Sequence, residues 1–537
     1  MGAGAATAGT KALLESANFD DVAAVVKSLP KEDKAKLLQA LEKCPPAGVN
    51  GLSQQQVPVG LQLLSSQHCT RSFDASREVP QKMVNAILEA VRSLPTSANT
   101  QPWTVIVVQG AARRSLAAKL LEKFDGGDDG RAEYADLPKS MPTRMQEATA
   151  AYKKQTGDTS RSKLREDCDF FGAPLHLVLC APVGPCLKED PPVDGVFLDM
   201  GSLMTAVMLG AHDQSLGVNA QMSLAKYTDV YREVLGKEQL PEDLFVVCGM
   251  SIGWPAGGRD PRTKQEFIAP RLDVDATTRW DTCDRSWMAA APPGSLSAVG
   301  KHGLLQLIQS RHCSHTLDSS KVVPKQILAS ILAAARFVLS AENSQPWSVT
   351  VIQGEARDKL SKAMLEHFDA GNDGKQTYKK YSAQNTAQMQ KGKDTYGFEL
   401  YEQRHGLERG DTAGRRLKYR PNYEFWGAPV LLLLNVPKCA VAGTFIDIGS
   451  YMMAILLGMH AYGLGGKPLG SVAKYTDICR QVLGTTAMPL DEHLVCGLCI
   501  GWPSGGRDPR ESPDWYPSRL TVEETSRWVC DADWLKP

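Results

Sequence analysis

The sequence predicts an α+β fold that is built twice in one chain, each copy a mixed β-sheet flanked by helices. The first observation is a repeat: Asn99-Thr100-Gln101-Pro102-Trp103 returns as Asn343-Ser344-Gln345-Pro346-Trp347, 244 residues further on. The second is that short apolar runs alternate with amphipathic stretches inside each copy. This alternation is typical of a sheet covered by helices, so one folding unit has been duplicated.

The composition excludes several classes of protein. The chain has 537 residues, of which 43% are hydrophobic and 22% charged, as in globular proteins with two or three domains. Sixty basic residues balance sixty acidic ones, so we expect no nucleic-acid partner. We find no apolar run near the roughly 18 residues of a membrane helix and expect no membrane partner. The start lacks a charged region followed by an apolar stretch, so we expect no signal peptide and a cytoplasmic location.

The repeat sets the domain organisation. We expect an N-terminal helical hairpin and linker at 1–58, the first repeat at 59–287, a linker at 288–300 and the second repeat at 301–537. Leucines and valines at helical spacing predict two short helices within 11–44, with Pro30 between them. The Ala-, Pro- and Gly-rich composition after Met288 is typical of a linker.

The same order of elements is expected in both repeats. In the first, we expect helices at 61–67, 80–94, 111–124, 199–214 and 227–235, and strands at 104–109, 175–180, 216–220 and 244–252. Residues 125–165 are polar and irregular and are interpreted as a lid. The corresponding residues 369–420 carry an insertion of 11, since the spacing between the repeats grows from 244 to 255. Residues 430–436 read as a buried strand.

Cysteines, tryptophans and glycines have structural interpretations. The thirteen cysteines are dispersed, which favours reduced thiols. Cys496 and Cys499 have the spacing of a metal or redox pair, but in a strand residues three apart face opposite sides, so we predict no metal site. Trp103 and Trp347 each follow a proline at a strand start and are expected in the core. The Gly-rich run after Gly253 contains prolines and therefore predicts a turn.

Five motifs occur in the same order in each repeat. In the first they are Gln67-His68-Cys69-Thr70-Arg71, Pro95 to Trp103, Phe170-Phe171-Gly172-Ala173-Pro174, Ala225-Lys226-Tyr227-Thr228-Asp229 and Arg271-Leu272. Together these motifs resemble the nitroreductase family. The resemblance implies an enzyme that binds FMN without a covalent link and takes electrons from NAD(P)H. It also implies a ping-pong mechanism in which nitroaromatics, quinones or related small electron-poor molecules are reduced.

The resemblance further implies a flavin site shared between two subunits, which a tandem chain forms internally as a pseudo-dimer. The first site would take Gln67, Cys69, Arg71, Arg271, Gln221, Met222 and Ser223 from repeat one and Ser340, Ala341 and Asn343 from repeat two. The second would take Arg311, Cys313, His315, Arg519, Leu469, Gly470 and Ser471 from repeat two and Pro95, Thr96, Ser97 and Asn99 from repeat one. The flavin carries the chemistry in this family, so no catalytic side chain and no metal are expected.

Arginine suits a flavin phosphate because its planar fork stays charged and pairs with phosphate oxygens. Gln67 stands at an arginine position of the family in the first site, and Glu342 faces it where small residues are usual. The second site keeps Arg311 and a more intact loop, so it is favoured slightly. Asn99 and Asn343 equally suit caps of local turns. The alternatives are a flavin-binding or scaffold protein without turnover, and a flavoenzyme of this fold with different chemistry such as reductive dehalogenation.

Overall fold

The computed structural model describes residues 57–157, 161–265, 268–281 and 302–535. The described residues belong to one compact unit, 55–537. The expected N-terminal helices within 11–44 and the linker at 288–300 lie outside the described residues. The domain limits expected from the sequence therefore stay predictions.

Repeat one contains every helix and strand that the sequence predicts for it, within a few residues. Its elements are α4 (Val59–Ser65), α5 (Gln81–Val91), β1 (Thr104–Gln109), α6 (Gly110–Asp125), α7 (Thr143–Thr156), α8 (Arg161–Cys168), β2 (Leu175–Pro182), α9 (Asp194–Asp213), β3 (Gly217–Gln221), α10 (Thr228–Leu235), β4 (Leu244–Gly253), α11 (Val274–Thr277) and β5 (Thr278–Asp281). The prediction that residues 125–165 are irregular was wrong in part, since α7 lies in this range and α8 begins in it. Helix α7 forms because Met145 and Ala148, three residues apart, lie on one face and are buried together.

Repeat two follows the same order, and the strand expected at 430–436 is β7. Its elements are α12 (Leu304–Ser310), α13 (Lys325–Ala335), β6 (Ser348–Gln353), α14 (Gly354–Asp369), α15 (Ala387–Gly397), α16 (Thr412–Tyr419), β7 (Val430–Pro437), α17 (Ala442–Ala461), β8 (Gly465–Leu469), α18 (Thr476–Ala487), β9 (Glu492–Gly501), α19 (Val522–Thr525) and β10 (Ser526–Val529). The longer second lid includes a π-helical segment, η11 (Phe398–Arg404), between α15 and α16.

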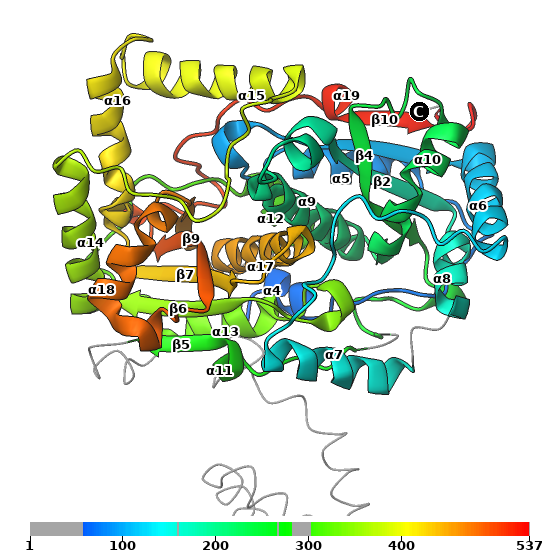
Figure 1. Cartoon of the computed structure of the whole chain (residues 1–537), viewed down its shortest axis with the longest axis horizontal. Helices are drawn as coiled ribbons and strands as arrows, with labels where there is room; N and C mark the ends of the chain where they lie inside the picture. The colour runs from blue at the N-terminus through cyan, green and yellow to red at the C-terminus, as the bar shows by residue number, and fades with distance from the viewer. Residues whose placement is uncertain (1–56, 158–160, 266–267, 282–301, 536–537) are drawn as a thin grey trace, which may run out of the picture. The chain divides into compact units, whose positions relative to one another are not determined.

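Each sheet is completed by a strand of the other repeat. The two five-stranded sheets have the orders β10-β1-β2-β4-β3 and β5-β6-β7-β9-β8. Strand β10 ends repeat two but pairs in parallel with β1, and β5 ends repeat one but pairs in parallel with β6 (Figure 1). In each repeat one sheet face packs an apolar core against outer helices, α6 and α10 in the first and α14 and α18 in the second. The exchanged strands intertwine the repeats, which form a pseudo-dimer within one chain.

The central contact of the pseudo-dimer is backbone against backbone. Helices α9 and α17 lie side by side at the centre of Figure 1 and make many contacts. A Cβ on Gly201 would lie 1.9 Å from the Ile446 carbonyl oxygen, and one on Gly449 would lie 2.0 Å from the Leu198 carbonyl oxygen. The Ser202 hydroxyl donates to the Gly449 carbonyl at 3.1 Å. Only glycine permits this approach, and the helices dock because both carry one at this point.

The same two helices are long and apolar enough to cross a membrane by length and composition. Neither helix is an uninterrupted apolar run, because each also contains polar residues such as Asp199 or Asp447, so the sequence alone did not predict them as candidate spans. Of the apolar windows, 100% in α9 and 94% in α17 is buried inside the protein. The two helices therefore have the burial of core helices.

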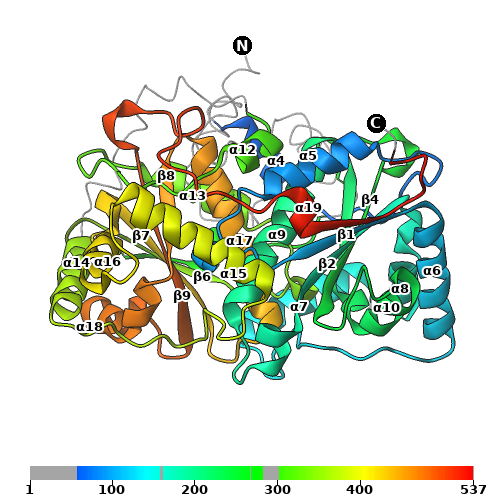
Figure 2. The same cartoon turned by 90° about the horizontal axis from the view of Figure 1, so that it is seen from above.

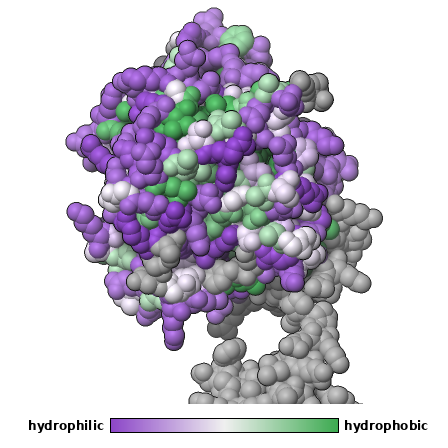
Figure 3. Space-filling model, turned by 90° about the vertical axis from the view of Figure 1, so that its right-hand side faces the viewer, coloured by the Kyte–Doolittle hydropathy of each residue, from purple (hydrophilic) through white to green (hydrophobic). Residues whose placement is uncertain are grey.

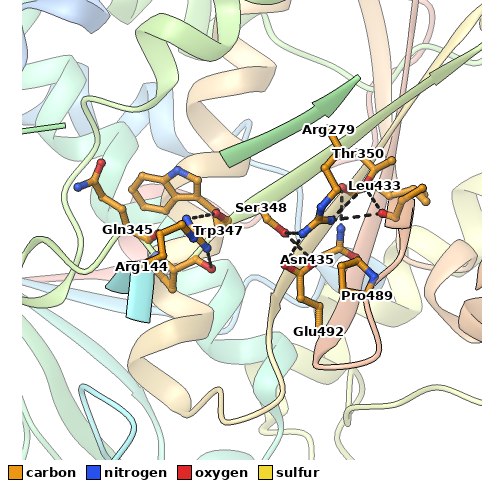
Figure 4. A network of polar contacts seen from close by, with 12 residues as sticks. Arg144, Arg279, Gln345, Trp347, Ser348, Thr350, Leu433, Asn435, Pro489 and Glu492 are labelled. Carbon is orange, nitrogen blue, oxygen red and sulfur yellow. Dashed lines mark hydrogen bonds and ion pairs between the residues drawn. The ribbon is translucent and has the colours of Figure 1, made fainter. Parts of the chain in front are cut away.

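Two arginines of repeat one bind residues of repeat two (Figure 4). Arg144 of α7 donates to the carbonyls of Gln345 and Trp347 at 3.1 and 3.0 Å. Arg279 of β5 pairs with Glu492. Repeat two makes the equivalent contact with repeat one. Gln388 of α15 donates to the Gln101 and Trp103 carbonyls at 2.9 and 2.8 Å. Helix α15 crosses the view in Figure 2. These contacts hold in place two loops, residues 95–103 around Asn99 and residues 339–347 around Asn343, which we call the Asn-containing loops.

The core tryptophans and the surface agree with a globular protein. Trp103 and Trp347 are both buried, as predicted, and Trp347 stacks on Tyr451 with centroids 4.6 Å apart. On the face drawn in Figure 3, apolar side chains form small patches among hydrophilic ones. Among the described residues, exposed large hydrophobic side chains include Tyr381, Phe398 and Leu417, which all belong to the second lid.

Two buried carboxyl groups on the central helices cap the Asn-containing loops. Asp199 of α9 accepts a hydrogen bond from the Ser97 backbone N–H at 3.2 Å, and Asp447 of α17 accepts one from Ala341 at 3.2 Å. Burial raises the pKa of Asp199 to about 8, although the Ser97 N–H and the nearby Lys380 and Arg519 oppose the shift. Burial also raises the pKa of Asp447 well above its usual range. Asp199 thus favours the protonated form at neutral pH.

The substitution Gly449→Ala is expected to destabilise the protein by about 2 kcal/mol or more, because its Cβ overlaps the Leu198 carbonyl. Thermal or denaturant unfolding measures the effect. The control is Gly410→Ala, at a glycine with nothing within 4 Å of the added Cβ. Equal stability of the two variants would show that the helices dock differently.

The pH dependence of stability follows from Asp199. Its pKa is about 8 when folded and about 4 when unfolded, so between these values the folded state binds the extra proton. Stability therefore falls as the pH rises from 4 to 8, by at most about 1.4 kcal/mol per pH unit from this group. Unfolding of Asp199→Asn between pH 5 and 8 is expected to show a shallower fall. Asp477→Asn, at a fully exposed side chain, should keep the slope of the native chain.

Candidate functional site

The Asn-containing loops reach across to the other repeat. Around Asn99 the chain takes left-handed backbone angles, with φ of 51° at Ala98 and 60° at Asn99. The Asn99 carboxamide oxygen accepts a hydrogen bond from Arg519, and its amide donates to the Ser518 carbonyl at 3.0 Å. Gln101 accepts the Leu520 N–H at 3.0 Å. The side chain of Asn99 therefore binds the other repeat rather than a local turn.

The mirror-related loop makes the mirror-related contacts. Asn343 accepts a hydrogen bond from Arg271 and donates to the Pro270 carbonyl at 2.7 Å. Gln345 accepts the Leu272 N–H at 2.9 Å. Each loop thus meets the closing Arg-Leu of the other repeat, which agrees with the cross-repeat pairing that the sequence resemblance implies.

A pocket of about 970 Å³ lies where the second site is expected. Ten of the eleven residues predicted for this site line it: Pro95, Thr96, Ser97, Asn99, Cys313, His315, Leu469, Gly470, Ser471 and Arg519. The eleventh, Arg311, is only 2% exposed. The structure therefore brings together residues that lie more than 400 positions apart in the chain.

Two arginines form a buried cationic pair at this pocket. Both Arg311 and Arg519 donate to the Ser93 carbonyl of repeat one. The Nε atoms of both side chains are buried without a hydrogen-bond partner, as is Nη1 of Arg311. Burial and the adjacent Arg311 lower the pKa of Arg519 to about 10. Within the described ranges neither guanidinium has a carboxylate at ion-pair distance, so the pair suits an anionic ligand.

His315 stands at a position where the family motif has an arginine or a lysine. Burial, together with the nearby Lys467 and Arg404, lowers its pKa to about 2, so the ring is neutral at physiological pH. Its ring lies 4.8 Å from the Trp426 ring. Its backbone N–H donates to Asp514 at 2.8 Å. His315 therefore contributes shape and aromatic contact to the pocket, without the charge expected of a phosphate ligand.

Several lining residues were not found from the sequence. They are mainly cations and aromatic rings of the lid and of β8: Tyr378, Lys380, Tyr381, Tyr396, Tyr401, Arg404, Arg415, Tyr419, Trp426 and Lys467. The insertion in the second lid was the available signal, but its side chains have no helical or strand periodicity that indicates where they point. Lys467 lies 4.3 Å from the centre of the Trp426 ring, and burial lowers its pKa.

The first site has a different charge. Residue 136 corresponds to 380, since the neighbouring carbonyls of Ala135 and Lys379 accept equivalent bonds from Gly443 and Gly195. Asp136 therefore stands where the second site has Lys380. Burial raises its pKa to about 6.

A second carboxyl group occupies the predicted cofactor turn of the first site. Asp167 accepts the Ser223 hydroxyl at 2.8 Å, and its carbonyl accepts the Gln221 side chain at 2.8 Å. Its counterpart in repeat two is Asn422, which is uncharged. Two residues of the predicted cofactor turn, Gln221 and Ser223, are thus already hydrogen-bonded to Asp167 of the same repeat.

The remaining residues predicted for the first site also make contacts within the chain. Arg71 donates to the Tyr152 hydroxyl at 3.0 Å, and Arg271 donates to the Phe337 carbonyl at 2.9 Å. Gln67 is buried, with its amide against Met208. Burial raises the pKa of Cys69. In the facing loop of repeat two, Ser340 accepts the Gln345 N–H at 3.0 Å and the Ala341 N–H donates to Asp447, both within that repeat.

Glu342, beside these residues, forms an ion pair of 2.8 Å with Lys153 of α7. Among the described residues no group of three or more histidine, cysteine or carboxylate side chains has a metal-binding arrangement. Cys496 and Cys499 are free, buried thiols of β9.

The comparisons with known proteins agree on one family. The model of the Nitroreductase family matches residues 64–254 and 308–502. The 4-nitrobenzoate reductase of Nocardioides sp. (strain LMS-CY) is 28% identical over 193 residues, 34% of this chain and 72% of that protein. The chloronitrobenzene nitroreductase of Comamonas testosteroni is 26% identical over 208 residues, 38% of this chain and 88% of that protein.

Among solved structures, the FMN and NADPH-dependent nitroreductase NfnB from Sphigopyxis sp. strain HMH is 26% identical, with a TM-score of 0.38. The alignment covers 42% of this chain and 97% of that chain. Since the family model matches more than half of the chain and does so once in each repeat, the protein belongs to the nitroreductase family, as a tandem duplication.

Proposed function

We propose that the protein is an FMN-dependent oxidoreductase that transfers electrons from NAD(P)H to nitroaromatic, quinone or related electron-poor acceptors. The observation that carries this proposal is the buried pair Arg311 and Arg519, which has no carboxylate partner in the described chain and of which Arg519 lines a pocket of about 970 Å³. Family membership supports the reaction class. Free thiols at the described cysteines suit a reducing compartment, and we place the protein in the cytoplasm.

The residues of the second site suit FMN. Arg311 and Arg519 would hold the phosphate, because fixed, desolvated guanidinium groups pair strongly with a dianion. Cys313 would lie beside it as a weak donor. The turn from Leu469 to Ser471 would present backbone N–H groups to the flavin ring, and the loop from Pro95 to Asn99 would cover it. Bound FMN supplies two-electron chemistry between the reductant and the acceptor.

The chain itself binds, orients and excludes water. In the proposed ping-pong sequence NAD(P)H and the acceptor occupy the same pocket in turn, so one set of aromatic walls serves both. For a nitro compound, NAD(P)H and one proton give NAD(P)⁺, a nitroso product and water. Burial of the site by both repeats strengthens the electrostatic contacts to charge that develops during the reaction.

We further propose one FMN in each chain, bound at the second site. In the first site Gln67 replaces Arg311 of the second, and Asp136 replaces Lys380. Asp167 adds a further carboxyl group at the predicted cofactor turn. Buried carboxyl groups disfavour an anionic cofactor, either by repulsion when charged or by the cost of keeping them protonated.

The test compares the two corresponding arginines. Arg519→Ala is expected to weaken FMN binding about 10- to 100-fold, because a charged hydrogen bond to the phosphate is lost. The matched control is Arg271→Ala, at the equivalent position of the first site. The measurement is FMN released per chain by heat, together with the dissociation constant from a fluorescence titration.

The native chain should hold one FMN, the Arg271 variant one and the Arg519 variant less than one at limiting FMN. Loss of flavin from the Arg271 variant alone would place the cofactor in the other site. Two FMN per native chain would contradict the single-site proposal.

A further inference from the structure

Residues 183–193 of repeat one bind a loop of the second lid. They join β2 to α9, whereas the corresponding segment of repeat two, 438–441, is shorter. Glu189 lies in this longer segment, and only 3% of its side chain is exposed. It contacts residues 379–384, which belong to no helix or strand and which we call the pocket loop. The contact therefore joins an extra segment of one repeat to the lid of the other.

The Glu189 carboxylate accepts hydrogen bonds from three donors of the pocket loop. Its Oε1 atom accepts the backbone N–H groups of Ala383 and Gln384 at 3.0 and 3.1 Å. The same atom accepts the Ser382 hydroxyl, and the other carboxylate oxygen pairs with the Lys379 ammonium. A buried carboxylate needs such donors, and it holds them in one geometry. Glu189 therefore fixes the pocket loop from its first residue to its last.

The pocket loop carries two residues that line the pocket of the second site, Lys380 and Tyr381. The Lys380 side chain reaches Gly470, where an added Cβ would overlap its Nζ atom. Gly470 belongs to the turn that the proposed function assigns to the flavin ring. A lysine side chain is long and flexible, so its charge stays at one place only if the backbone that carries it is fixed. The position of the Lys380 charge therefore depends on the backbone that Glu189 holds.

The fold does not require the contact with Glu189, because both lids share another anchor. Tyr378 donates its hydroxyl to the Val495 carbonyl at 2.7 Å, and Tyr134 of the first lid makes the equivalent bond at 2.7 Å. These two bonds tie each lid to the sheet of its own repeat. The contact between Glu189 and the pocket loop is additional to them.

The first repeat lacks both halves of this contact. Ala135 stands at the position of Lys379 and has no ammonium group. Pro138 stands at the position of Ser382 and has no hydroxyl. Residues 438–441, which correspond to the segment of Glu189, contain no carboxylate. The carboxylate and its donors therefore occur together, and only beside the pocket of the second site.

We propose that Glu189 is a positioning residue of the second site, which holds the pocket loop so that the Lys380 ammonium lies against the turn at the flavin ring. The inference rests on the proposed function, which assigns this turn to the cofactor. A fixed cation beside a flavin favours the reduced form, because reduction brings negative charge to the ring. Glu189 is not among the residues that line the pocket, so it acts through Lys380.

Hydrogen exchange of the full chain, with and without added FMN, tests the contact itself. Glu189→Gln is expected to speed the exchange of the pocket-loop amides about tenfold, because the charge of their shared acceptor is lost. The matched control is Asp190→Asn, which removes an exposed carboxylate of the same segment and should leave the exchange unchanged. Unchanged exchange in Glu189→Gln would overturn the inference.

The midpoint potential of the bound flavin tests the role of Lys380. Lys380→Met is expected to shift the two-electron equilibrium about tenfold toward oxidised flavin, which lowers the potential by about 30 mV. Glu189→Gln should lower the potential of the native chain in the same direction and should add nothing to Lys380→Met. A residue with a merely structural role would give additive shifts. Additive shifts, or a potential that Glu189→Gln leaves unchanged, would contradict the proposal, and Asp190→Asn should keep the native potential.

A second variant keeps the test decisive if Glu189→Gln fails to fold. Ser382→Ala removes one donor from the other side of the contact, and it should change exchange and potential in the same directions by smaller amounts. The flavin content of the same preparations separates the two hypotheses. Retained FMN with unchanged exchange and potential overturns this inference and leaves the proposed function intact. A native chain that binds no FMN overturns the proposed function and, with it, the role of Glu189 at the flavin.

Discussion

The contact between α9 and α17 is the constraint on which the rest of the structure depends. Gly201 and Gly449 let two helix backbones touch, and no larger residue fits at either point. This contact fixes the distance between the repeats. Only at that distance do β5 and β10 reach the opposite sheets, and only then do Asn99 and Asn343 meet Arg519 and Arg271 of the other repeat. The docking of the two helices, the exchange of the two strands and the position of the two loops therefore all depend on the same packing contact.

Joining the repeats in one chain removes the need for them to stay identical. In a homodimer a substitution changes both sites at once, because the two interfaces are related by symmetry. Here Arg311 of repeat two is matched by Gln67 of repeat one, and Lys380 is matched by Asp136. The charges of the two sites have diverged while the scaffold contacts of Asn99 and Asn343 have stayed equivalent. Packing requires the interface contacts to stay equivalent in the two repeats. The charged residues that differ between the two sites are free of that requirement.

Buried charge explains why the two sites differ in what they can hold. Arg311 and Arg519 share the Ser93 carbonyl and repel each other, so an anion bound beside them would offset the repulsion. In the first site Arg71 is paired with the Tyr152 hydroxyl and Ser223 with Asp167, but Gln67 Oε1 and Arg271 Nε are also buried without a hydrogen-bond partner. The two sites therefore differ in charge, with Gln67 in place of Arg311 and Asp136 in place of Lys380.

The sequence by itself determined the duplication, the fold class, the order of the central strands and helices, and ten of the residues that line the pocket of the second site. These features are local or repeated: apolar runs such as β7 report burial directly, and the motif residues keep their spacing in both copies. Tertiary structure alone decided the exchange of β5 and β10. A four-residue strand such as Thr278–Asp281 has no apolar alternation of its own and forms only against a preformed edge. It also decided the pairing of Asp167 with Ser223 and the gathering of Lys380, Tyr401 and Arg415. Contacts between residues distant in the chain depend on packing that no local pattern records.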